Sequence, residues 1–368
     1  MATATIQPLA SYLPSSLLKD IRITLTDATS ATVKVITGES TEILSLDLDA
    51  YDGVITLYDL RSVVEEYMLS HDLACKAFTI QVLLSGTTLA TRSVTIIYCS
   101  HTVDDISVLR THFLTTLHYK LTHRSLLEKL SFFCLTGDSL KEEWTIYTCL
   151  TANVNVVRVD TFVNYASQTA STNQVRQILV DYDSVVEYLE DNMSNWYTQP
   201  WKILAIVVTV GTRTFSFYYT DKVPALAFAF RNAFNVYEVC ALSAVTTDVS
   251  EVERSSAVIG GKTEFYDQTE THSYEVESAP LPTNIAYWIR QMFCSHSVYL
   301  HQRNDDSYDY PVLITESKCE VSDDNTQLST VKFTWQYEDG KCPLVPFSGI
   351  EQADDLDAFS NVYNNQFD

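Results

Sequence analysis

Hydrophobic and polar residues alternate along much of this chain with the period of two that is typical of strands buried on one face. In the first hundred residues, Ile21, Ile23 and Leu25 alternate strictly with polar residues, and Val33 and Val35 continue the pattern. Tyr, Thr and Val are plentiful, whereas Gly and Pro number nine each. Because β-branched and aromatic residues favour strands, we expect a mainly β fold with minor α content.

Two runs, 42–48 and 54–58, flank an Asp52-Gly53 pair that predicts a turn between strands. A short helix is expected next, with Asp59 placed to cap it. The helix would bury an apolar stripe at helical spacing: Leu60, Val63, Val64, Tyr67 and Met68. Two strand-like runs, 78–84 and 93–98, then predict a hairpin that turns at Gly86.

A tetrapeptide of this helix occurs twice, as Ser62–Glu65 and Ser184–Glu187, 122 residues apart. The second copy is also followed by two apolar runs, which turn at Gly211, 125 residues after Gly86. The same order of elements at nearly the same offset indicates a duplicated module. Repeated modules without a repeated catalytic set favour a scaffold or adhesion role over chemistry.

The second module is expected to begin at Trp144, with strands at 145–150 and 153–159. Asp183 is a candidate cap for its helix, whose core side would carry Val185, Val186, Tyr188 and Leu189. The segment before it, about 100–138, is expected to be helical or mixed.

The third region is expected to hold strands at 235–242, 251–259, 270–276, 298–301, 312–315 and 330–337. A helix over 283–293 would follow Pro282, since proline is tolerated at a helix start. The predicted organisation has five parts: a first β-module at 1–100, a bridging segment at 101–143, a second β-module at 144–221, a C-terminal β/α domain at 222–345 and an acidic flexible tail at 346–368. The modules are expected to be β-sandwich-like.

The formal net charge of −23 opposes binding to a nucleic-acid backbone, which needs a basic surface. The acidic residues are unevenly spread: Ser250 to Asp368 holds 21 Asp and Glu against 7 Lys and Arg. The first residues lack the basic and apolar stretches of a secretory signal, and no run approaches the ~20 apolar residues of a membrane helix. We therefore expect folding in a cytoplasm, without membrane insertion.

The eight cysteines are scattered, and most lie in apolar runs without any Cys-x-x-Cys pair. Buried free thiols are the expected state, with disulfides left open. Asp47, Asp49 and Asp52 invite a calcium-loop interpretation, but Tyr51 and Tyr58 occupy loop positions where ligands are needed. An acidic turn is favoured over an irregular calcium site.

His112, His118 and His123 do not form a zinc motif, so surface or capping roles are favoured. Gly260 and Gly261 precede Lys-Thr as in a P-loop, yet a β-turn explains them better because the earlier glycine and the helix are missing. Paired acidic residues are expected to lie on solvated faces. Most of the five dispersed tryptophans are expected to pack in cores. We predict no catalytic residues, no metal and no cofactor.

The third region resembles tail and baseplate structural proteins of bacteriophages that infect gut bacteria. The resemblance covers about 220–345 and is carried by a strand leading to Pro280–Pro282, a Trp288-bearing helix and strands at 295–300, 310–314 and 331–337. The segment 230–235 is also similar, and the N-terminal pattern matches more faintly. The resemblance implies a distal-tail or baseplate-like role, with β-sandwich-like domains that assemble into a ring and no catalytic residues.

The leading hypothesis is therefore a virion structural protein of a tail, baseplate or connector, assembled in the host cytoplasm. Its expected partners are copies of itself and neighbouring tail proteins. Phe359, Tyr363 and Phe367 in the acidic tail are candidate docking anchors, with a solubilising end as the equal alternative. The competing functions are a carbohydrate-binding or adhesion protein of a bacterial surface and, third, a hydrolase with unrecognised motifs.

Overall fold

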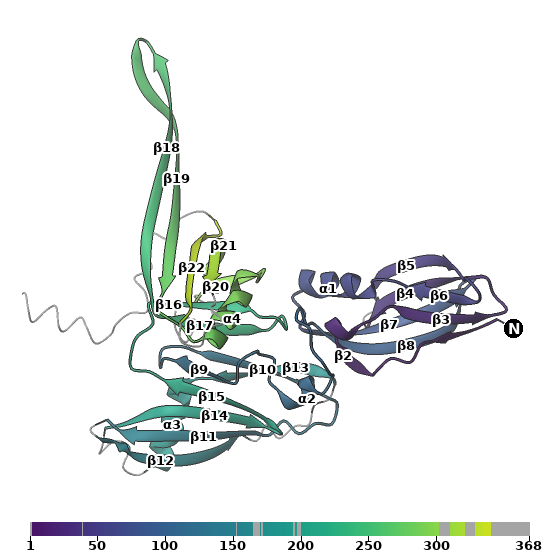
Figure 1. Ribbon diagram of the computed structural model, residues 1–368, viewed down its shortest axis with the longest axis horizontal. Coiled ribbons are helices and arrows are strands. Elements are labelled where there is room, and N and C mark those ends of the chain that lie inside the picture. The colour runs from purple at the N-terminus through teal and green to yellow at the C-terminus, as the bar shows by residue number, and fades with distance from the viewer. Residues whose placement is uncertain are drawn as a thin grey trace, which may run out of the picture.

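The computed structural model describes residues 2–38, 40–151, 153–164, 170, 172–193, 196, 200–301, 310–320 and 328–339. Side chains of 153–156 and 164 are outside that description. The described chain is mainly β, as predicted, with four short α-helices among its strands. It forms two β-sandwich modules and a third, larger sheet from which a long hairpin projects (Figure 1).

The first module packs a three-stranded sheet against a five-stranded sheet. The smaller sheet has the order β1-β3-β6 and consists of β1 (Thr3–Ile6), β3 (Ile21–Thr26) and β6 (Val54–Leu57). The larger has the order β2-β8-β7-β4-β5 and consists of β2 (Tyr12–Pro14), β8 (Thr87–Ile97), β7 (Cys75–Leu84), β4 (Ser30–Thr37) and β5 (Glu42–Asp49). A 3-10 turn, η1 (Ser15–Leu17), and helix α1 (Leu60–Ser70) complete the module. The alternating residues of β3 and β4 fill its core, as the sequence pattern predicts.

The second module follows a short helix, α2 (Val108–Thr111), and again contains two sheets. Its five-stranded sheet has the order β12-β11-β14-β15-β9 and consists of β12 (Asn153–Asn164), β11 (Glu142–Leu150), β14 (Trp201–Val210), β15 (Arg213–Tyr219) and β9 (Tyr119–Thr122). Strands β10 (Glu128–Cys134) and β13 (Gln174–Val180) form the second sheet, and helix α3 (Tyr182–Asn192) leads into β14.

The two modules have the same order of elements and the same pairing of strands. In each, an edge strand pairs in parallel with the last strand of the module, β2 with β8 and β9 with β15. The remaining neighbours of the larger sheet are antiparallel, in the order β8-β7-β4-β5 and β15-β14-β11-β12. In both modules the helix joins the smaller sheet to the hairpin at Gly86 or Gly211. The first module alone carries the additional strand β1 among the described residues.

This pairing corrects the bridging role expected for 101–143. Strand β9 is an edge of the large sheet and β10 is half of the small one, so the second module begins near Tyr119 rather than at Trp144. The sequence pattern missed β10 because every residue of that strand is buried, which removes the alternation of polar and apolar positions.

The third region is built on a seven-stranded sheet with the order β17-β16-β20-β21-β22-β19-β18. Its strands are β16 (Leu226–Arg231), β17 (Tyr237–Leu242), β18 (Ala244–Ile259), β19 (Lys262–Ser278), β20 (Val298–Leu300), β21 (Tyr310–Glu320) and β22 (Thr330–Tyr337). Helix α4 (Thr283–Phe293) lies where the sequence predicts it, begins directly after Pro282 and buries Trp288, Ile289 and Met292. One hydrophobic cluster runs from the second module through this sheet and α4.

Both predicted helix caps are corrected by the structure. Asp59 has a left-handed backbone (φ 51°), and its side chain caps no backbone group of α1 but accepts a hydrogen bond from Ser62 Oγ at 2.7 Å. In α3 the cap is Asp181, which accepts from the backbone N–H groups of Asp183 and Ser184. Asp183 itself lies within the first turn, because the helix begins at Tyr182.

No helix in the described ranges is both long enough and apolar enough to cross a bilayer. Residues 340–368, which include Phe359, Tyr363 and Phe367, lie outside the described structure.

Candidate interaction surfaces

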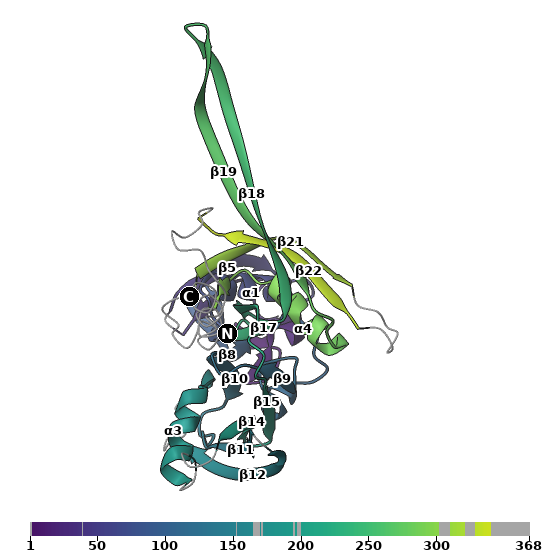
Figure 2. The same ribbon diagram turned by 90° about the vertical axis from the view of Figure 1, so that its left-hand side faces the viewer.

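The most prominent surface feature is a two-stranded ribbon that leaves the third sheet and extends away from both modules (Figures 1 and 2). We call residues 249–273 the arm. At its root, β19 still pairs with β22 through Tyr274 to Glu277, and Tyr274 stacks on the buried Trp335 at 4.2 Å. Beyond Tyr274, β18 and β19 pair only with each other among the described strands. Twelve residues of β19, from Ser273 to Lys262, correspond to an arm about 40 Å long.

The arm ends in a tight turn at Gly260 and Gly261, whose φ values are 60° and 80°. Two successive positive φ angles match a type I′ turn, whose twist suits a two-residue hairpin. The prediction of a β-turn at these glycines is therefore confirmed. Strands β18 and β19 are longer than the predicted 251–259 and 270–276. The missed stretches, 244–250 and 262–269, are almost entirely exposed, so no buried face imposes an alternation there.

The arm divides into an acidic shaft and a less charged tip. The shaft, 249–253 with 267–273, carries four acidic residues and no Lys or Arg, whereas the tip, 254–266, carries Arg254, Lys262 and Glu264. Arg254 lies over the Phe265 ring at 5.5 Å. Four large apolar side chains of the tip are exposed by more than half: Val258, Ile259, Phe265 and Tyr266.

A second unusual surface is the solvent-facing side of the five-stranded sheet in the second module, which we call the outer face. Residues paired directly across neighbouring strands point to the same side of a sheet. One row of such partners crosses all five strands: Val159, Tyr147, Ala205, Tyr218 and Leu121. The adjacent row is also uncharged: Thr161, Thr145, Val207, Ser216 and Tyr119.

The side chains of the two rows remain at least partly accessible to solvent, except Ala205, which is 6% exposed. Val159, Tyr218 and Leu121 are 53%, 45% and 68% exposed, and Tyr119 packs edge-on against Tyr218 with ring centroids 6.1 Å apart. The corresponding face of the first module carries charges instead, including the Lys34–Glu42 ion pair at 2.6 Å and Asp47. On a chain with a net charge of −23, this uncharged face is a candidate contact surface.

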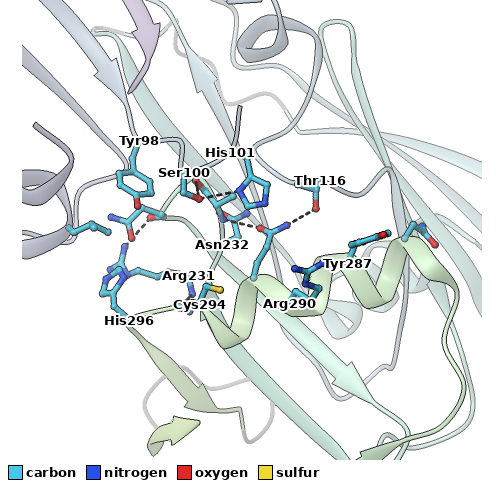
Figure 3. A pocket seen from close by; sticks show the side chains of 16 residues that line it. Tyr98, Ser100, His101, Thr116, Arg231, Asn232, Tyr287, Arg290, Cys294 and His296 are labelled. Atoms are coloured by element: carbon cyan, nitrogen blue, oxygen red, sulfur yellow. Dashed lines mark hydrogen bonds between the residues drawn. The ribbon is translucent and has the colours of Figure 1, made fainter. Parts of the chain in front are cut away.

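A hollow of about 690 Å³ lies where the first module meets α4 and the start of the third sheet (Figure 3). On one side, Gln291 Nε2 donates to the Thr116 hydroxyl at 2.8 Å, and Gln291 Oε1 accepts from the backbone N–H of Ala233 at 2.9 Å. Ser100 lies at the same seam, where its backbone N–H donates to the Ala233 carbonyl. These contacts join segments far apart in the sequence.

The opposite side of the hollow holds the loop after α1. Arg231 forms an ion pair with Asp72 at 3.4 Å, and the His296 ring lies 3.3 Å from the same carboxylate. Asn235, which has a left-handed backbone, donates to the Leu73 carbonyl at 3.0 Å. Because these side chains bridge the first module and the third region, the hollow is best described as a joint between them.

A buried polar cluster connects the second module to the third sheet. Lys120 forms an ion pair with Glu128, and both side chains are at most 5% exposed. Lys120 Nζ also donates to the Val239 carbonyl at 2.8 Å and lies over the Trp288 ring. Burial, with the Glu128 charge nearby, raises the pKa of Tyr219 well above its ordinary value.

The chemistry predicted from the sequence can be followed residue by residue. Asp52 and Gly53 form a turn with positive φ angles, as predicted. His112 and His118 bring their rings within 5.6 Å, whereas His123 instead contacts Ser125. Within the described ranges, no group of three His, Cys, Asp or Glu side chains is arranged to hold a metal ion.

Trp144, Trp288 and Trp335 are buried, which confirms core packing for these three tryptophans. The cysteines from Cys75 to Cys319 are free thiols, four of them buried, and Cys342 lies outside the described residues. Burial raises the pKa of Cys75 and of Cys240 to about 12, which keeps both thiols protonated and unreactive at neutral pH.

No known family model matches the sequence, and no curated protein is significantly similar to it. Among solved structures, the plexin A4 extracellular region is 9% identical, with a TM-score of 0.22 over 91% of this chain and 39% of that one. Trypsin-activated α-2-macroglobulin from Escherichia coli is 8% identical, with a TM-score of 0.20 over 90% and 23% of the two chains. This chain thus spans well under half the length of either protein, and likenesses this weak carry no functional argument.

Proposed function

We propose that this chain is a virion structural protein, a tail, baseplate or connector component that assembles with copies of itself and with neighbouring tail proteins. The proposed assembly with other molecules rests on the presence of the arm. An isolated two-stranded hairpin is at best marginally stable in water, and three or more strands or a packed face are needed for independent stability. An arm about 40 Å long is therefore suited to lie against another molecule.

The composition of the arm supports the same function. No described residue outside the arm pairs with its strand edges over the shaft, and unpaired edges serve as templates for contact with another chain. Acidic side chains along the shaft, among them Glu251, Glu253 and Asp267, oppose unspecific pairing of two arms. Contact would then concentrate at the tip, where apolar side chains are exposed.

The viral part of the proposal rests on the resemblance of the third region. The elements that carry it are β19, β20, β21 and β22 of the third sheet and helix α4 with Trp288. A tail or baseplate ring would place the protein in the virion after assembly in the host cytoplasm. In such a particle, Phe359, Tyr363 and Phe367 are candidate anchors on a neighbouring protein, and no cofactor is required.

Removal of the arm tests the assembly function. We would join Val249 to Ser273, which are direct cross-strand partners, through an Asn-Gly turn and leave the root of the hairpin intact. Light scattering after size exclusion, with negative-stain imaging, should show rings or larger assemblies for the full chain and monomers for the shortened one. Equal urea midpoints would show that the shortened chain still folds, since the arm packs on no core.

Two results would overturn the proposal. A full chain that stays monomeric at high concentration would contradict the assembly function. Assemblies that persist after removal of the arm would show that the arm does not mediate assembly. A persistent monomer that binds immobilised glycans would instead favour the carbohydrate-binding or adhesion function considered from the sequence.

A further inference from the structure

The arm tip and the outer face are two exposed apolar surfaces that the same chain cannot bring together. The arm points away from the third sheet on the side opposite the second module, as both ribbon views show (Figures 1 and 2). The outer face belongs to β9, β11, β12, β14 and β15 of that module. Contact between the two surfaces therefore requires two molecules.

We propose that the arm tip of one copy packs on the outer face of the second module of another copy. This inference rests on the proposed self-assembly and names the surfaces that meet. Val258, Ile259, Phe265 and Tyr266 would lie across the row from Val159 to Leu121. Because the two surfaces differ, the contact is heterologous and runs head to tail, which generates a ring when the rotation closes.

Charge favours this pair of surfaces over contacts made by the shaft or by the face of the first module. Each molecule carries a net charge of −23, so like-charge repulsion opposes most orientations of two copies. The two outer-face rows carry no charged residue, and the tip carries two basic residues and one acidic residue. The shaft and the face of the first module are charged and would repel or remain solvated.

The dimensions of the two surfaces also agree. Five strands spaced about 4.8 Å apart give an outer face about 24 Å wide, which accommodates a two-stranded ribbon laid flat on it. Sheets pack on one another in this manner, about 10 Å apart, through side chains such as valine and tyrosine. Exposed apolar patches of a few hundred Å² on a soluble protein are commonly contact sites.

A photo-cross-linking experiment can locate the contact directly. The full chain would carry Phe265→benzoylphenylalanine and be mixed with an isotope-labelled full chain before irradiation. We expect cross-links between labelled and unlabelled chains, and mass spectrometry should map them to 119–121, 157–159 or 218.

Charge substitutions provide a second test of the contact. Leu121→Asp and Tyr218→Asp should each weaken self-association by about tenfold or more, since an unpaired charge enclosed in an interface opposes association. Gln81→Asp is the matched control: Gln81 faces outward on the sheet of the first module, between Lys34 and Thr91, and its substitution should change association less than twofold. Urea unfolding of each variant would show whether it folds.

The outcomes separate this inference from the proposed function. Assemblies whose cross-links map to other parts of the neighbouring copy, or which tolerate both Asp substitutions, would overturn the inference and leave the assembly function standing. Cross-links to an added tail protein instead of to a second copy would also overturn it. Absence of any assembly of the full chain would overturn both.

Discussion

The first and second modules share eight elements in one order and one pattern of strand pairing, yet they use their outward faces differently. In the first module, the row Ser45, Lys34, Gln81 and Thr91 crosses the large sheet and is polar throughout. In the second, the row from Val159 to Leu121 is apolar. Most inward residues of both sheets are apolar and buried, with Lys120 of β9 a charged exception. Topology therefore depends on the buried positions, while the outward positions are free to become a contact surface.

The identical residues of the shared tetrapeptide do not make the same contacts in the two helices. In α1 the second valine, Val64, is fully buried, whereas in α3 the first valine, Val185, is buried. One residue corresponds to about 100° of rotation on a helix, so the two helices present different faces to their sheets. The duplication is preserved in the arrangement of helices and strands rather than in the contacts of identical residues.

The modules also differ in the residues that they bury on the parallel edge strand and on the next strand of the chain. The second module places Lys120 of β9 and Glu128 of β10 in its interior, whereas the corresponding strands of the first module carry the buried Leu13 and Ile21. A buried ion pair is a weak stabiliser, because the loss of hydration offsets the attraction. Its contacts with Val239 and Trp288 make it part of the connection to the third sheet.

The largest expected effect comes from breaking this pair. Glu128→Gln leaves the Lys120 charge buried without its partner, which should lower the free energy of unfolding by about 3–5 kcal/mol. Urea unfolding followed by tryptophan fluorescence would measure the loss, since Trp288 lies beside Lys120.

A matched double variant makes the second module resemble the first at these positions. Lys120→Leu with Glu128→Ile should recover the stability of the natural chain or exceed it by about 1–4 kcal/mol, as in other replacements of buried ion pairs by apolar residues. A double variant as unstable as Glu128→Gln would show that the hydrogen bond to Val239, rather than the charge balance, holds the two parts together.

The helix starts provide a smaller contrast. Asp181→Ala should cost about 1 kcal/mol, because the side chain caps the backbone of α3 at Asp183 and Ser184. Asp59→Gly should be neutral or stabilising by a few tenths of a kcal/mol, because glycine adopts the left-handed backbone of that position without strain and the backbone N–H keeps its bond to Asp20. Thermal unfolding of both variants would compare them, and equal losses would contradict the different capping of the two helices.

The sequence was sufficient to predict the elements whose buried and exposed residues alternate or follow helical spacing. The helices α1, α3 and α4 and the hairpins at Gly86 and Gly211 all lie where that pattern places them. Strand β10 was not predicted because both of its faces are buried, Glu128 included, so buried and exposed positions do not alternate along it. The cap of α3 was misassigned because Asp181 and Asp183 are both suitable caps two residues apart, and only the helix start decides between them.

The candidate surfaces were harder to predict than the core. Tyr218 and Leu121 stand at outward positions of their strands, but their cross-strand neighbours come from segments far away in the sequence. The parallel pairing of β9 with β15 is a long-range contact that no local pattern encodes. The outer half of β19, residues 262–269, was not predicted either, because it is exposed on both sides and lacks the hydrophobic period by which strands are recognised.

The smallest expected effect is a difference in acid sensitivity. Burial and the nearby Arg124 lower the pKa of His123 in the second module below the ordinary value of 6.5. The unfolded chain then binds a proton at a higher pH than the folded chain does, so His123 makes stability decrease as pH falls below about 6.5 until the folded pKa is reached. Above that range the contribution is constant.

His123→Asn should therefore flatten the dependence of the urea midpoint on pH between 7 and 5, without a large change at pH 7. His71→Asn is the control from the first module, because that imidazole is exposed at the end of α1 and stacks on Tyr67. If both substitutions change the slope equally, the acid response does not come from burial in the second module. A slope that only His123→Asn reduces would assign the response to the module whose interior accommodates polar groups, in agreement with the burial of Lys120 and Glu128 there.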